Sequence, residues 1–139
     1  MAGIYIHIPF CKQACHYCNF HFATSLHYKD EMTKALGREI ELQKEYLAHE
    51  KIETIYFGGG TPSLMSIEDL AMIINKIKAV FSVLPEAEIT LEANPDDITE
   101  EKLQSWKETG INRLSIGIQS FFNEDLQWMN RAHNASQAV

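Results

Sequence analysis

The sequence predicts an α/β protein built around one parallel sheet. Short runs of β-branched and aromatic residues alternate four times with longer segments of helical periodicity. A polar or glycine-rich stretch follows each short run, which is typical of the carboxyl ends of parallel strands. About four βα units of this kind, joined by right-handed crossovers, give a parallel sheet that is either open or curled towards a barrel.

Bulk properties indicate a soluble globular chain that forms one domain or a piece of one. Its 139 residues are 45% hydrophobic and 22% charged, which is ordinary for such a domain. The net charge of −7 argues against a nucleic-acid partner, because phosphate backbones bind clustered Lys and Arg. No apolar run approaches the ~20 residues of a membrane span. Clustered cysteines without an export leader predict a cytoplasmic location.

The first two units occupy the first 81 residues. Residues 4–8 alternate bulky apolar with polar side chains and predict a strand, which a proline ends. Residues 28–47 carry apolar side chains at three- and four-residue steps and predict a helix. A short buried strand is expected at 54–57. The loop at 58–63 follows it, because three glycines and a proline disfavour helix and sheet.

A second helix and a third strand come next. Ser66 has an acidic residue three positions later, a variant of the capping box, and predicts the start of a helix that extends to Phe81. Residues 88–92 predict a strand with one apolar face, and 93–97 predict a turn.

The last third of the chain repeats the pattern. Thr99 is expected to cap a short helix that ends at Glu108, with Gly110 in a left-handed conformation after it. Residues 112–118 predict the fourth strand. Asn123 is expected to cap a fourth helix whose pattern continues into the last residues.

All three cysteines, Cys11, Cys15 and Cys18, lie within eight residues and have the spacing C-x-x-x-C-x-x-C. Three thiolates on a short loop can bind three irons of a 4Fe–4S cluster, and the open fourth iron can then chelate a small molecule. A C-x-x-C redox pair would leave Cys11 unexplained. A Cys₃His zinc site is a second alternative, but zinc fingers usually have two separated ligand pairs, and this sequence has none. Unligated core cysteines are the remaining alternative. The histidines weighed for the zinc site are His7, His16 and His21.

The cysteine pattern, with Tyr17 before its last cysteine, resembles the radical S-adenosylmethionine (SAM) enzymes. The flanking segments 5–11 (YIHIPFC) and 17–20 (YCNF) resemble the oxygen-independent coproporphyrinogen III oxidase group, most closely its HemW branch of haem chaperones. The resemblance covers nearly the whole chain. It implies a partial TIM-like barrel of the radical SAM type, of which residues 1–139 would be the N-terminal portion, truncated at its C-terminal end.

The glycine-rich loop G-G-G-T-P-S resembles the radical SAM element that meets the amino group of the methionine moiety of SAM. This resemblance assigns SAM contacts to Gly59, Gly60 and Thr61, with Gly58 as a structural first glycine. The glycines alone are equally compatible with an ordinary tight βα connection. No Lys follows them, so the loop is not a phosphate loop of the Walker type.

Further SAM contacts are implied by later motifs. Glu92 lies in L-E-A-N-P, which resembles the E-x-N-P motif of the family, and Gln119 lies in S-I-G-I-Q-S-F, where the family's Gln would bind the ribose. Arg131, in N-R-A-H, falls where the family has a SAM-contacting Arg. Tyr5 and Tyr17 are expected to cover the cluster and SAM. Without the resemblance, Glu92 and Gln119 are compatible with ordinary polar residues at strand ends. Arg131 would then be a solvated charge on a helix, and the two tyrosines would be core residues.

The resemblance also implies a function. Radical SAM enzymes pass one electron to SAM and form methionine and a 5′-deoxyadenosyl radical, for which an electron donor is required. The full-length haem chaperone would bind haem and transfer it to an acceptor protein. The alternative is a coproporphyrinogen III oxidase, which has another cysteine where this chain has Phe20, so Phe20 favours the chaperone. No sequence context marks a haem ligand among the histidines considered, which are His7, His16, His21 and His133.

Overall fold

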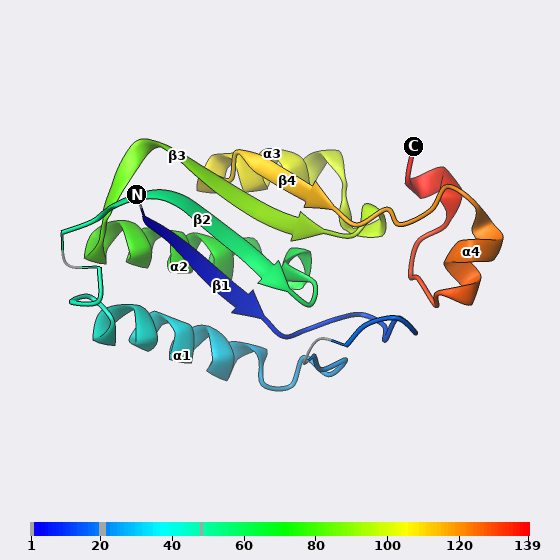
Figure 1. Cartoon of the computed structure of the whole chain (residues 1–139), viewed down its shortest axis with the longest axis horizontal. Coiled ribbons are helices and arrows are strands. Elements are labelled where there is room, and N and C mark those ends of the chain that lie inside the picture. Colours follow the sequence, from blue (N-terminus) through cyan, green and yellow to red (C-terminus); the bar gives the residue numbers. More distant parts are fainter. Residues whose placement is uncertain (1, 20–21, 48) are drawn as a thin grey trace.

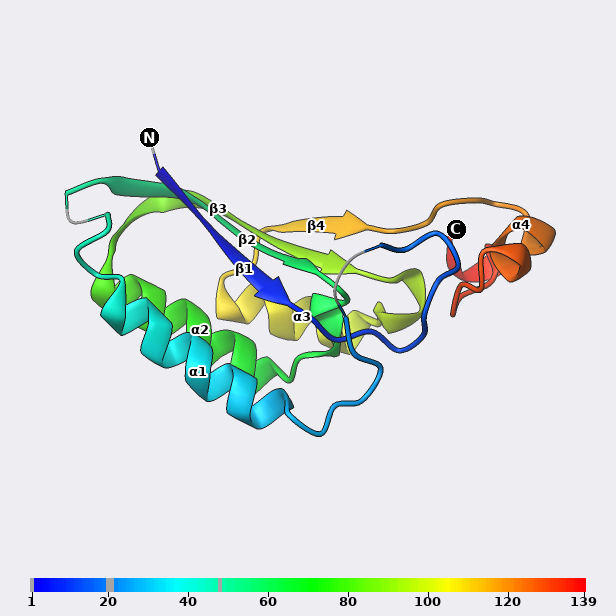
Figure 2. The same ribbon diagram turned by 60° about the horizontal axis from the view of Figure 1, so that its bottom comes forward.

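The computed structural model describes residues 2–19, 22–47 and 49–139. Within them, four parallel strands form one sheet in the order β1-β2-β3-β4, and helices α1 to α3 cover one of its faces (Figures 1 and 2). The strands are β1 (Ala2–Ile8), β2 (Lys51–Gly59), β3 (Ser82–Ala93) and β4 (Arg113–Ile116). The helices are α1 (Lys29–Leu42), α2 (Ile67–Val80), α3 (Glu100–Thr109) and α4 (Asn123–Trp128). The predicted parallel α/β architecture is confirmed.

Three local predictions at helix ends are confirmed. The Ser66 hydroxyl accepts a hydrogen bond from the Asp69 backbone N–H at 3.1 Å, and Thr99 accepts one from Lys102 at 3.2 Å. Gly110 ends α3 in the left-handed region with φ of 99°. The two hydroxyls accept hydrogen bonds from backbone N–H groups that have no partner within the helix.

Several boundaries differ from the predictions. The helix α1 ends at Leu42, before the expected residue 47, and β3 begins at Ser82 rather than at residue 88. Strand β2 extends to Gly59 and a 3₁₀ helix covers Pro62–Leu64, so the stretch predicted as a loop at 58–63 is partly regular. The early part of β3 pairs with β2 around a register shift between Ile52 and Thr54. A bulge of this kind interrupts the alternation of apolar and polar residues from which a strand is recognised.

The fourth helix is also shorter than predicted and is capped differently. Helix α4 ends at Trp128, and Asn130 follows with φ of 56°. Phe122, not Asn123, occupies the N-cap position, and the Asn123 side chain accepts a hydrogen bond from the Ala135 backbone N–H at 2.8 Å. The expectation that Asn123 caps this helix was therefore wrong.

The hydrophobic core lies between the sheet and the helices. The apolar stripe of α2 packs on side chains that alternate along β2 and β3, and its fully buried members are Leu70, Ile73, Ile74 and Ile77. The strand residues that alternate with these core residues point to the other face of the sheet, away from the helices. On β1 to β3 that face carries polar and aromatic side chains such as Tyr5, Tyr56 and Glu92. Of the helices in the described ranges, none is long and apolar enough to cross a membrane.

We predict that Leu70→Ala destabilises the fold by about 2–5 kcal/mol, because it leaves a cavity in the core and Ala does not weaken the helix. Leu70 is 0% exposed, whereas Leu42 on α1 is 68% exposed. Urea unfolding followed by circular dichroism measures both effects, and Leu42→Ala, the control, should change stability by less than about 0.5 kcal/mol. Equal effects of the two substitutions would contradict this placement of the core.

Candidate functional site

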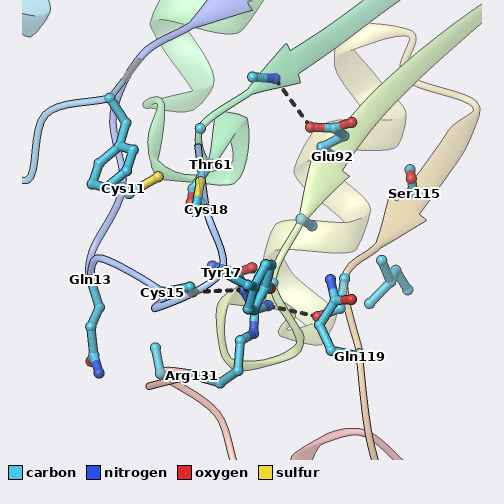
Figure 3. Close-up of a pocket in the computed structure, with 18 residues that line it drawn as sticks. Cys11, Gln13, Cys15, Tyr17, Cys18, Thr61, Glu92, Ser115, Gln119 and Arg131 are labelled. Atoms are coloured by element: carbon cyan, nitrogen blue, oxygen red, sulfur yellow. Dashed lines mark hydrogen bonds between the residues drawn. The ribbon is translucent and has the colours of Figure 1, made fainter. Parts of the chain in front are cut away.

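A cavity of about 350 Å³ lies at the carboxyl ends of the strands. All four connections that follow the strands contribute to its wall, as expected for parallel α/β folds. Figure 3 shows the three cysteines on one side of this cavity and Glu92, Ser115 and Gln119 on the other. Every predicted site residue except Tyr5 lines the cavity: Cys11, Cys15, Tyr17, Cys18, Gly59, Gly60, Thr61, Glu92, Gln119 and Arg131.

The three cysteines are free and half-buried. Burial raises the pKa of the Cys11 thiol, the Thr61 hydroxyl opposes this shift, and the sulfur atoms of Cys18 and Cys15 add to it. Soft thiolates without disulfide partners are the ligands that iron–sulfur clusters prefer. In the described part of the chain, no three His, Cys, Asp or Glu side chains are placed to hold a single metal ion. His21, one of the histidines weighed for a zinc site, lies outside the described residues.

The glycine-rich loop packs its backbone directly on the end of β1 and on the cysteine segment, residues 9–18. The Gly60 N–H donates to the Ile8 carbonyl at 2.7 Å, and the Thr61 N–H donates to the Phe10 carbonyl at 2.6 Å. A Cβ atom at Gly60 would lie 2.5 Å from the Phe10 oxygen and 3.0 Å from the Cys11 sulfur. Gly59 has φ of 110°, which side chains rarely allow. Gly60 is thus required by the close approach of the two segments, and Gly59 by its backbone conformation.

Glu92 lies at the end of β3 and is held by two donors. The Tyr56 hydroxyl donates to Oε1 at 2.7 Å, and the Gly59 N–H donates to Oε2 at 3.2 Å. The side chain is half-buried and faces the cavity. A half-buried carboxylate that lines a cavity and keeps free lone pairs is suited to bind a cationic group.

Gln119 follows β4 in a left-handed conformation, with φ of 68°. The preceding residue, Ile118, accepts a hydrogen bond through its carbonyl from His133 Nε2 at 3.0 Å. Here His133 is assigned the tautomer with a proton on Nε2. This ring is 4% exposed, and burial lowers its pKa, so the neutral form is favoured. His133 supports the turn that carries Gln119.

Arg131 lies in the cavity wall and not on a solvated helix face. One guanidinium nitrogen, Nη2, donates to Asn94 Oδ1 at 2.9 Å and to the Gly117 carbonyl at 2.7 Å. The other, Nη1, lies 3.3 Å from the Cys15 sulfur and 3.3 Å from the Tyr17 hydroxyl. Arg131 therefore places a positive charge beside the Cys15 sulfur.

The segment after α4 holds the cysteine segment by further hydrogen bonds, which the sequence did not predict. The His16 N–H donates to the Met129 carbonyl at 3.1 Å, and His16 Nδ1 lies 2.8 Å from the Trp128 carbonyl oxygen. Asn130 Nδ2 donates to the Ala14 carbonyl at 2.7 Å. The left-handed Asn130, a residue type that tolerates this conformation, was the only local signal of a turn here.

A second anchor, also missed from sequence, lies on the other side of the cysteine segment. Lys12 forms ion pairs with Asp96, at 2.7 Å, and with Asp97. Asp97 is 2% exposed and accepts a hydrogen bond from the Ser63 hydroxyl at 2.7 Å. The cysteine segment, the glycine-rich loop and the turn after β3 are therefore joined by one buried carboxylate.

Tyr5 does not line the cavity. Its ring stacks on Tyr56 with centroids 6.0 Å apart, and its hydroxyl lies 3.2 Å from His7 Nδ1. Tyr17, by contrast, lines the cavity. Phe20, which favoured a chaperone over an oxidase, lies outside the described residues.

The donor set fits the expected groups chemically. Free thiols on one side suit an iron–sulfur cluster, and Arg131 offers an N–H to one sulfur, an interaction common around such clusters. Bare glycine backbone, a carboxylate and an amide on the remaining walls suit a ligand that carries an ammonium group and hydroxyls.

Comparison with known proteins agrees with this chemistry. The family model described as "Radical SAM superfamily" matches residues 5–139. The chain is 38% identical over 142 residues to a heme chaperone HemW of Haemophilus influenzae, covering 98% of this chain and 37% of the relative. It is also 38% identical over 143 residues to an oxygen-independent coproporphyrinogen III oxidase of Bradyrhizobium diazoefficiens, covering 99% and 31%.

The coproporphyrinogen III oxidase HemN of Escherichia coli, described as a radical SAM enzyme, has a similar fold. Its TM-score is 0.88 at 28% sequence identity, covering 97% of this chain and 32% of that one. The chain thus spans about a third of the length of the relatives it matches. Because the family model covers nearly the whole chain and the cavity has the matching donor set, the chain belongs to the radical SAM superfamily.

Proposed function

We propose that this chain binds a 4Fe–4S cluster through Cys11, Cys15 and Cys18, and SAM in the adjoining cavity. The observation that supports this best is the convergence of three free thiols with bare glycine backbone and a carboxylate on one cavity. When bound, a 4Fe–4S cluster with one open iron supplies the electron for reductive cleavage of SAM to methionine and a 5′-deoxyadenosyl radical.

The residues around the cavity would bind and orient SAM. Glu92 provides a negative charge for the ammonium group, next to glycines that let the ligand approach the backbone. The Gln119 amide can bind ribose hydroxyls as both donor and acceptor. Arg131 balances thiolate charge at Cys15, and the Tyr17 ring limits the access of water.

We further propose that the whole protein is a haem chaperone that passes haem to an acceptor protein in the cytoplasm. Phe20, in place of the extra cysteine of the oxidases, supports this choice. Coproporphyrinogen III oxidase is the second candidate, supported by the relative of equal identity and by the fold of HemN.

Anaerobic reconstitution with iron and sulfide should load about four irons per chain, since three thiolates bind one cubane cluster. Cys11→Ala, Cys15→Ala and Cys18→Ala should each abolish most of the iron and the broad absorption of the cluster. Iron analysis and absorption spectroscopy measure this. Replacement of a surface group, as in Ser136→Ala, is the control. Stoichiometric zinc held by the same cysteines in iron-free protein would contradict the proposal.

Glu92→Gln and Gln119→Ala should each weaken SAM binding by roughly tenfold or more, because the first removes the charge that pairs with the ammonium group and the second removes an amide that binds hydroxyls. Calorimetry on reconstituted protein measures the affinity, and iron content should stay unchanged. Glu88→Gln is a matched control, since Glu88 lies on the same face of β3 but outside the cavity. If both site variants bind SAM as tightly as the unmodified chain, their assignment is wrong.

Haem titration and an anaerobic coproporphyrinogen turnover assay, both run on the reconstituted whole protein, distinguish the two candidate functions. A chaperone should bind haem stoichiometrically and leave coproporphyrinogen unchanged, because it lacks the extra oxidase cysteine at Phe20. Haem titrated into solvent is the control for binding, and a preparation without cluster is the control for turnover. Decarboxylation of coproporphyrinogen would favour the oxidase.

A further inference from the structure

Tyr56 lies behind the cavity wall and does not line the cavity, yet it contacts a residue that does. It is on β2, where it pairs in register with Thr90 of β3. Glu92 lies two residues further along β3 on the same face, within reach of a long side chain on the neighbouring strand. The Tyr56 hydroxyl donates to Glu92 Oε1 at 2.7 Å.

The position of the Tyr56 ring is fixed by its neighbours. It stacks on Tyr5 from β1, with an angle of 20° between the ring planes. The two rings also lie close over Gly58, where an added Cβ would be 2.8 Å from Tyr56 and 3.0 Å from Tyr5. The absence of a side chain at Gly58 thus lets the aromatic pair lie flat beside the glycine-rich loop.

The two donors to Glu92 come from different parts of β2 and hold different oxygens. Tyr56 holds Oε1 and the Gly59 N–H holds Oε2. Two fixed contacts define the plane of the carboxylate, and each oxygen keeps a free lone pair for a ligand. The hydrogen bond to Glu92, followed by burial, raises the pKa of Tyr56, so its hydroxyl keeps the proton that it donates.

We propose that Tyr56 is a positioning residue for SAM: its hydroxyl orients the Glu92 carboxylate towards the ammonium group of the ligand. This inference rests on the proposed SAM site and extends it to a side chain that does not touch the cavity. Tyr56 acts through Glu92, so its effect depends on the presence of that carboxylate and on a ligand with an ammonium group.

The test compares Tyr56→Phe, Glu92→Gln and the double variant in the reconstituted chain. Phe keeps the ring stacked on Tyr5 and removes only the hydroxyl. Three ligands are titrated by calorimetry: SAM, S-adenosylhomocysteine, which has the ammonium group but no sulfonium, and 5′-methylthioadenosine, which lacks the amino acid part. Thr54→Val is the matched control, because Thr54 lies on the same face of β2, two residues further from the cavity.

Tyr56→Phe should weaken SAM and S-adenosylhomocysteine by roughly tenfold, as expected for loss of a hydrogen bond to a charged group. It should leave 5′-methylthioadenosine binding and iron content unchanged. In the Glu92→Gln background, Tyr56→Phe should have little further effect, because coupled residues are not additive. Thr54→Val should bind all three ligands as the unmodified chain does.

Three results would overturn the role of Tyr56 while the SAM site itself stands. These are unchanged SAM affinity in Tyr56→Phe, an equal loss for 5′-methylthioadenosine, or additive effects in the double variant. Failure of the unmodified reconstituted chain to bind SAM would instead reject the proposed function, and the role of Tyr56 with it.

Discussion

The site depends on the close backbone contact between the cysteine segment and the glycine-rich loop. The ladder between β1 and β2 continues beyond the strand ends through Gly60 and Thr61, whose N–H groups reach the carbonyls of Ile8 and Phe10. A side chain at Gly60 would overlap the Phe10 oxygen, so this contact exists only because position 60 is glycine. It places Cys11 against the carboxyl ends of β1 and β2.

Much of the fold could be predicted because its signals are local. Ser66 and Thr99 cap helices through bonds to residues three positions away, and Gly110 ends a helix through its own φ angle. Strand β3 was harder, because a register shift between Ile52 and Thr54 breaks the alternation on which a strand prediction rests. Helix α4 was predicted too long, since its end depends on contacts of the 128–131 segment with a distant part of the chain.

The difference between local signals and long-range contacts also explains which parts of the site could be predicted. The cysteine and glycine motifs are contiguous, so both could be recognised in the sequence, and the family resemblance supplied the role of the glycines. The supporting contacts join residues far apart in sequence: Lys12 pairs with Asp96, and Asn130 donates to the Ala14 carbonyl. No local pattern indicates which residues pair in this way, and only the folded chain brings the partners together. Tyr56 likewise became relevant only when the register of β2 and β3 placed it diagonal to Glu92.

These supporting contacts act together because the cysteine segment lies between them. One side is tied to Asp96 and Asp97 through Lys12, and the other to Trp128 and Met129 through His16. Each hydrogen bond contributes only about 1 kcal/mol, so no single one fixes the loop. Their joint effect is to limit the conformations of three cysteines before any ligand arrives, which lowers the entropy cost of binding. Because Arg131, which follows α4, also reaches the Cys15 sulfur, the segment after α4 is part of the site.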